Sequence, residues 1–247
     1  MGSVPEEKGI NKAMLIVVSA VIGALVLWGV ISPAGLDSAM NATLAWVTAN
    51  LGWFFLVVVF LFVVAMLIVM ISKWGKIRLG GEDAKPEFTT MKWFAMLFAA
   101  AMGIGLVFWG VSEPLSHYFA PPFGDPASDE AVGIALRYSF LHWGMSAWVV
   151  YAFVGMCLGY FAYNLGRPFT VGSVIEPLVG NQRWLMPVAD FTAIFATFLG
   201  VATSLGLGVM QVAEGLNAVF GFPANNTVYS ILVLVFTACF ITSAVTG

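Results

Sequence analysis

Charged residues are scarce in this chain, and their scarcity excludes an ordinary soluble protein. They make up 9% of the 247 residues, whereas a soluble domain contains about 25%. Hydrophobic residues reach 60%, above the roughly 45–50% of soluble domains. Residues 51–71 and 191–213 contain no charge at all, and about 20 such residues cross a hydrocarbon core. The composition therefore predicts a membrane protein with several spans.

Cysteines are few, and the common catalytic motifs are missing. Cys157 and Cys239 fall inside expected helices, and neither belongs to a CxxC motif or has His or Cys nearby at the spacing of a metal site. We interpret both as small buried hydrophobic side chains. The sequence contains no phosphate-binding loop, zinc signature or hydrolase nucleophile elbow. These absences argue against an enzyme and against a resident cofactor.

Six segments are long and apolar enough to span a membrane as helices. Their apolar runs are continuous, whereas the strands of a membrane barrel alternate, so the predicted fold class is an all-α polytopic membrane protein. The first segment is too long for a signal-peptide core, and a second span follows it without a cleavage site. The six predicted spans cover about residues 14–31, 51–71, 93–111, 138–163, 191–213 and 228–245.

Basic residues are distributed unevenly between the predicted loops. If the N-terminus is cytoplasmic, only Arg137 of the 10 Lys and Arg residues lies on the opposite side of the membrane. This bias predicts a cytoplasmic N-terminus. The net charge of −3 is too small and too spread out to indicate a nucleic-acid partner or a polybasic lipid patch.

The third predicted span has glycines near its middle, at Gly103 and Gly105. Each glycine weakens a helix by about 1 kcal/mol relative to alanine. Being two residues apart, they do not form the stripe of a small-xxx-small packing motif. One interpretation is an interrupted helix, whose freed backbone groups meet a cavity, an ion or a substrate. The alternative is close packing of an ordinary helix.

The fourth predicted span begins with FLHWGMSAWVVY, residues 140–151. On a helix, Trp143, Tyr151 and Trp148 project at about 0°, 80° and 140°, within one broad face. They could form a belt at the membrane surface, which suits Trp143 best because it lies early in the span. They could instead form a cage for a quaternary ammonium cation, which electron-rich ring faces attract. We interpret His142 as a structural histidine beside Trp143.

Three longer runs resemble one transporter family. They are MGIGLVFWGVSEPLSHY from Met102, HWGMSAWVVYAFVGMCLGYFAYNLGRP from His142, and FATFLGVATSLGLGVMQ from Phe195. Together they are similar to the betaine/choline/carnitine transporter family, in particular to its glycine betaine transporters. The resemblance implies a leucine-transporter-like fold of two leading helices followed by two inverted repeats.

The same resemblance implies the domain organisation. Residues 1–13 would form a cytoplasmic tail, 14–71 the two leading transmembrane helices, and 72–92 a cytoplasmic loop. Residues 93–247 would hold the first four helices of the first inverted repeat. The second repeat is absent, so we expect this chain to be the N-terminal half of a protein about twice as long.

Site residues follow from the resemblance position by position. The aromatic box that surrounds a trimethylammonium group matches Trp143, Trp148 and Tyr151. The glycine stretch that lines the same site matches Met102, Gly103, Ile104 and Gly105. One sodium ion would be held by main-chain carbonyl groups that fall at Ala99 and Met102. A second sodium position of some members uses two hydroxyl groups in the fifth helix, of which Thr197 matches one while Val201 replaces the other.

Gly105 bears on the choice of solute. Relatives that prefer choline often carry Asp at this position, because choline lacks a carboxylate and the protein must supply one. Glycine at 105 therefore favours a zwitterion such as glycine betaine.

The implied function is cation-coupled uptake, with Na⁺ as the coupling ion, of glycine betaine or a similar quaternary ammonium osmolyte by alternating access. The expected location is the bacterial inner membrane, and homotrimers are familiar in this family. A choline, carnitine or sulfonium transporter, or an exchanger, is an alternative within the family. A non-transport membrane scaffold is an alternative of another class.

Several polar residues near the spans carry weaker expectations. We expect His117 in the outer loop after the third span, with Glu113 near the end of that span. Asp190 is expected at the N-terminus of the fifth span, where an acidic side chain favours a helix. Arg167 is interpreted as a topology anchor, and Glu176 as a loop residue.

Overall fold

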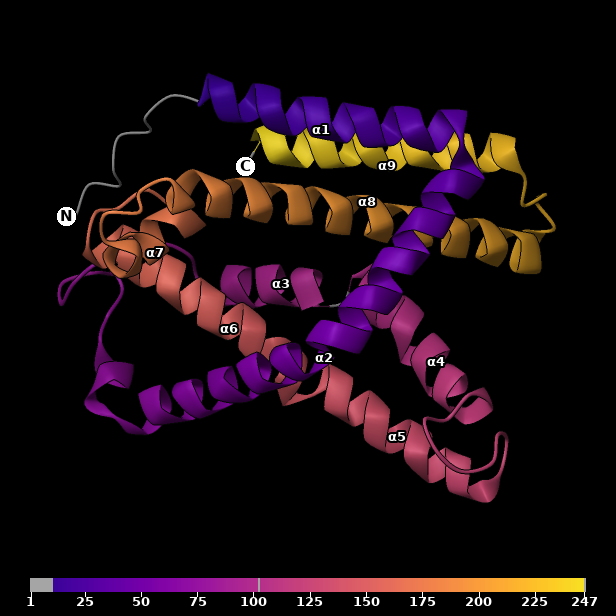
Figure 1. Cartoon of the computed structure of the whole chain (residues 1–247), viewed down its shortest axis with the longest axis horizontal. Helices are drawn as coiled ribbons and strands as arrows, with labels where there is room; N and C mark the ends of the chain where they lie inside the picture. Colours follow the sequence, from indigo (N-terminus) through magenta and orange to yellow (C-terminus); the bar gives the residue numbers. More distant parts are fainter. Residues whose placement is uncertain (1–10, 102, 247) are drawn as a thin grey trace. The chain divides into compact units, whose positions relative to one another are not determined.

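The computed structural model describes residues 11–101 and 103–246, and over this part of the chain the fold is all-α, without a β-strand. This confirms the predicted fold class. The α-helices are α1 (Lys12–Ile31), α2 (Pro33–Ile71), α3 (Thr90–Ala101), α4 (Ile104–Phe119), α5 (Asp129–Trp143), α6 (Met145–Gly159), α7 (Val171–Val179), α8 (Leu185–Phe220) and α9 (Asn226–Thr246) (Figure 1). A 3₁₀ turn, η1 (Lys73–Lys76), follows α2, and a π-helical turn, η2 (Tyr160–Asn164), extends α6.

Five helical segments of the described residues are long and apolar enough to cross a membrane. They correspond to the first, second, fourth, fifth and sixth predicted spans. These segments are Lys12–Ile31, Pro33–Ile71, Asp129–Asn164, Leu185–Phe220 and Asn226–Val245. The third predicted span is present as two shorter helices, α3 and α4.

The second span is longer than predicted. Its helix has 39 residues and starts at Pro33, whereas the predicted span starts at residue 51. Proline suits the first turn of a helix because it lacks only an N–H that would be unpaired there. At about 1.5 Å per residue, α2 is about 58 Å long, nearly twice the hydrocarbon thickness of about 30 Å. Much of the loop expected between the first two spans is therefore helical.

The chain forms two compact units. One contains the described residues of Met1–Lys85 together with Phe140–Phe195, and the other contains Pro86–Ser139 together with the described residues of Ala196–Gly247. In the first unit α2 packs against α6, where the rings of Phe62 and Phe153 stack with their centroids 4.1 Å apart. In the second unit the α5 residue Ile134 is almost fully buried.

Polar contacts in the first unit join α7 to α8. The Gly172 N–H, in the first turn of α7, donates to Asp190 Oδ1 on α8 at 2.6 Å. A Cβ at position 172 would lie 2.8 Å from Asp190 Oδ2 and 2.8 Å from the Met186 carbonyl oxygen, so only glycine fits. The expected position of Asp190 at the start of its own helix was wrong, because α8 already begins at Leu185. Its carboxylate instead accepts a hydrogen bond from the N-terminal turn of α7.

An ion pair joins α7 to the segment that precedes it. The guanidinium group of Arg167 lies against the carboxylate of Glu176, which is on α7. Both side chains are about one-third exposed, so water screens part of their attraction. Arg167 therefore has a local structural partner, and Glu176 is a helical residue, which corrects the expectation of a loop.

We predict that replacing Asp190 with alanine will destabilise the first unit. A hydrogen bond to a charged group contributes about 1.5–3 kcal/mol, and Asp190→Ala removes this acceptor from the Gly172 N–H. Thermal unfolding of the full-length protein in detergent would measure the loss. Asp37→Ala, at an exposed position of α2, is the matched control and should change stability by less than about 0.5 kcal/mol. Equal effects of the two substitutions would contradict the prediction.

Candidate functional site

The third predicted span is interrupted at Gly103. Helix α3 ends at Ala101 and helix α4 begins at Ile104, while Gly103 between them has extended backbone angles, φ −70° and ψ −178°. Figure 1 shows α3 and α4 as separate helices that run in different directions. This confirms the interrupted helix over the alternative of an ordinary packed helix. Met102, which was predicted to line the site, lies outside the described residues.

The interruption places two helix ends beside one another in the sequence. The last four carbonyl groups of a helix and its first four N–H groups have no partner within that helix. Ala99 belongs to the last turn of α3, so its carbonyl oxygen is one of those groups. Gly105 belongs to the first turn of α4, where the helix dipole is positive. Chemically, the α3 end can receive a cation and the α4 end an anionic group.

The predicted aromatic residues lie at a second break. Trp143 is the last residue of α5, Gly144 follows it, and α6 begins at Met145. The indole N–H of Trp148 donates to the main-chain carbonyl of Trp143 at 3.0 Å. The ring centroids of Trp148 and Tyr151 are 6.0 Å apart, with an angle of 40° between the planes.

The structure thus brings Trp148 and Tyr151 together. Their side chains are well exposed, at 46% and 73%, so a ligand could reach their faces. Trp143 is half-buried, and the contact it makes with Trp148 uses its main-chain oxygen. With the indole N–H of Trp148 already paired, the remaining surface of that ring is apolar and electron-rich.

Gly144 is a residue of this site that sequence reasoning missed. A Cβ there would clash with the carbonyl oxygen of Phe140, so the chain cannot turn from α5 into α6 in this way with a larger residue. The signal was present in the sequence as a glycine between two tryptophans, in the run WGMSAW.

The predicted site residues divide between the two compact units. Trp143, Trp148 and Tyr151 belong to the first unit. Gly103, Ile104, Gly105, Ala99 and Thr197 belong to the second unit, with Thr197 exposed on α8. The aromatic part of the predicted site and the part at the helix break therefore belong to different units.

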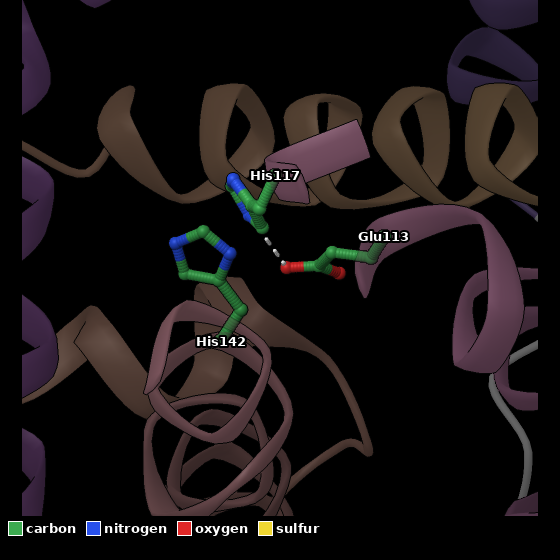
Figure 2. Close-up of side chains that lie close together, drawn as sticks. All are labelled: Glu113, His117 and His142. Atoms are coloured by element: carbon green, nitrogen blue, oxygen red, sulfur yellow. Dashed lines mark ion pairs between the residues drawn. The ribbon is translucent and has the colours of Figure 1, made fainter. Parts of the chain in front are cut away.

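Helix α4 also holds a buried carboxylate. Glu113 is 9% exposed, and its Oε1 lies 3.5 Å from Nε2 of His117, one turn further along the helix (Figure 2). The expected loop position of His117 was wrong, because α4 continues through Pro114 to Phe119. The His117 ring also lies 5.3 Å from the ring of Tyr138. When protonated, His117 would compensate the charge of the Glu113 carboxylate, which is costly to bury alone.

Comparison with known proteins identifies the family. Residues 13–247 match the family described as betaine/carnitine/choline family transporter. The chain is 42% identical over 244 residues to the probable glycine betaine transporter of Desulfitobacterium hafniense (strain Y51), an alignment that covers 97% of this chain and 49% of that relative. It is 45% identical over 234 residues to the glycine betaine transporter OpuD of Bacillus subtilis (strain 168), covering 94% of this chain and 46% of the relative.

A third relative is named for other solutes than glycine betaine. The ectoine/hydroxyectoine transporter of Virgibacillus pantothenticus is 38% identical over 240 residues, which cover 96% of this chain and 48% of that protein. The chain thus spans about half the length of the relatives it matches. The names of the family and of these relatives are those of transporters and not of enzymes. The chain belongs to the betaine/carnitine/choline transporter family.

Proposed function

We propose that the full-length protein takes up glycine betaine or a similar quaternary ammonium osmolyte, driven by the sodium gradient through alternating access. The observation that carries the proposal is the interruption of the third span at Gly103 in a member of this family. Broken spans with open helix ends are the usual binding elements of secondary transporters. A membrane scaffold, whose spans only pack against one another, would not need an interrupted helix.

The aromatic residues supply the cation-binding part of the proposal. A trimethylammonium group has no hydrogen to donate, so it is held by ring faces and not by acceptor atoms. Trp148 and Tyr151 offer two such faces with centroids 6.0 Å apart, and each contributes about 0.5–2 kcal/mol when water is excluded. Trp143 is proposed as the third wall of this box.

The helix break supplies the anion-binding and ion-binding part. The carboxylate of glycine betaine would be received by the N–H groups at the start of α4, near Gly103, Ile104 and Gly105. One sodium ion would be held by the carbonyl oxygens of Ala99 and Met102, and the Thr197 hydroxyl is the candidate ligand of a second sodium position. Sodium that binds one conformation more tightly shifts the population toward it, which couples the gradient to solute movement.

The solute itself is proposed from Gly105. No side chain at this position brings a carboxylate, so a ligand that carries its own is favoured over choline. Choline, carnitine and sulfonium solutes, and exchange in place of symport, are the competing proposals within the family. One of the relatives is named as an ectoine/hydroxyectoine transporter, which makes ectoine a further solute to test.

We further propose a location in the bacterial inner membrane with the N-terminus in the cytoplasm, and a homotrimer of the full-length protein. The orientation rests on the distribution of basic residues. The expected role is osmotic protection.

Uptake of radiolabelled glycine betaine tests the proposal directly. Cells that lack their own betaine transporters and express the full-length protein should accumulate betaine in sodium buffer and lose most uptake when potassium replaces sodium. Uptake that persists without sodium and collapses with a protonophore would contradict sodium coupling. Excess unlabelled choline, carnitine or ectoine would show, by competition, which solute the site prefers.

A further inference from the structure

A pocket lies at one end of the first compact unit, where α2 and the extended α6 both finish. Its volume is about 550 Å³, within the roughly 300–1,000 Å³ of small-molecule sites. The side chains that line it include Lys73, Lys76, Arg78, Glu82 and Asn164. The betaine site proposed above uses none of these residues.

The charges of the pocket favour an anion. Its lining contains three cationic side chains and one carboxylate, that of Glu82. The Arg78 guanidinium uses one of its five N–H donors on the carbonyl oxygen of Glu82, at 3.0 Å, which orients it within the loop. Lysine and arginine together are the residues with which proteins bind phosphate, lysine as a point charge and arginine as a two-pronged donor.

The pocket is built by Asn164, a residue far away in the sequence. Its Oδ1 accepts a hydrogen bond from the Gly80 N–H at 3.2 Å, and its Nδ2 donates to the Arg78 carbonyl at 2.9 Å. Gly80 and Gly81 adopt φ values of +86° and +98°, which turn the loop toward this amide. The Leu79 side chain lies against Gly159 of α6. The loop that carries the cations is thereby fixed to the end of α6.

The same pocket lies at the expected depth of lipid headgroups. Candidate spans end at Ile71 and at Asn164, and Lys73 follows the first of these ends by two residues. Ile71 is 81% exposed and Trp74 is 55% exposed, an apolar and an aromatic side chain typical of the boundary between lipid tails and headgroups.

We propose that this pocket binds a phosphate-bearing anion, and its depth favours the phosphodiester headgroup of an anionic phospholipid. A soluble phosphate ester offers the same chemistry and is the second source to be tested. A polybasic lipid patch contains about four to eight Lys and Arg residues. With three cations, this site depends on shape as well as on charge.

Lipid binding to the purified full-length protein tests the proposal. Native mass spectrometry would follow titration with phosphatidylglycerol and, separately, phosphatidylcholine. Lys73→Gln with Lys76→Gln should weaken phosphatidylglycerol binding about 25-fold, because each lysine contributes about five-fold. Lys85→Gln with Lys92→Gln is the matched control, because it removes the same charge from residues that do not line the pocket, and it should change binding less than two-fold.

A third variant separates a built pocket from simple attraction by charge. Asn164→Ala keeps all three cations but removes the two hydrogen bonds that fix the loop, and should weaken phosphatidylglycerol binding at least five-fold. Wild-type binding by this variant, or equal losses in the two lysine double variants, would overturn the proposal. Displacement of phosphatidylglycerol by glycerol 3-phosphate would support the pocket and identify the soluble ester as an occupant. Retention of the lipid against that competitor would support the pocket with the lipid as its ligand.

Discussion

Replacing Trp148 and Tyr151 together with alanine should lower the affinity of the full-length protein for glycine betaine, by about 5-fold to about 700-fold. Each ring is expected to contribute about 0.5–2 kcal/mol to a desolvated trimethylammonium group, and every 1.4 kcal/mol is a factor of ten in affinity. Because the two ring centroids are 6.0 Å apart, the single substitutions should not add up to the double one. Isothermal titration calorimetry with betaine, in sodium buffer, would measure all three variants.

A second aromatic pair provides the control for this experiment. Trp53 and Phe54 on α2 are 65% and 47% exposed, and their centroids are also 6.0 Å apart. Replacing both with alanine should leave betaine affinity unchanged. Trp148→Phe adds a further test, since it keeps a ring face but removes the N–H that donates to the Trp143 carbonyl. If the Trp148/Tyr151 double variant binds betaine like the wild type, these rings do not form the cation site.

Gly144→Ala should reduce betaine affinity at least ten-fold and destabilise the protein by about 1–3 kcal/mol. The added methyl group has no room beside the carbonyl oxygen of Phe140, and overpacking by one carbon costs about this much. Relief of the clash requires the main chain between Phe140 and Met145 to shift. Such a movement would stretch the 3.0 Å hydrogen bond between Trp148 and Trp143 and displace the ring of Trp148.

The matched control for Gly144 lies on α6, the helix that follows it. At Gly155 of α6 a Cβ would meet nothing within 4 Å outside the local helix backbone, so Gly155→Ala should be tolerated. It should stabilise α6 by up to about 1 kcal/mol, because alanine favours a helix over glycine, and leave betaine binding intact. Betaine titration and thermal unfolding of both variants would measure the difference. Similar behaviour of the two would show that the break at Gly144 does not position Trp148.

Much of the architecture could be predicted because its causes are local in the sequence. The length and apolarity of residues 51–71 and 191–213 are enough to predict spans, and both lie within helices of the structure. The break at Gly103 was also predictable, because glycine is a weak helix former at its own position. Local propensity did not predict that α2 begins at Pro33 or that α4 continues through Pro114 to His117.

The residues alone were enough to predict an all-α membrane protein of the betaine/carnitine/choline transporter family with a broken third span. The aromatic rings were predicted early in the fourth span, but they lie near its middle because that span already begins at Asp129. Which distant residues come into contact could not be predicted from the sequence. Asn164 forms hydrogen bonds with main-chain groups 84 and 86 residues away, and Asp190 accepts a hydrogen bond from an N–H group 18 residues away. No regular spacing in the sequence marks these contacts, because they arise only when α2 packs against α6 and α7 lies against α8.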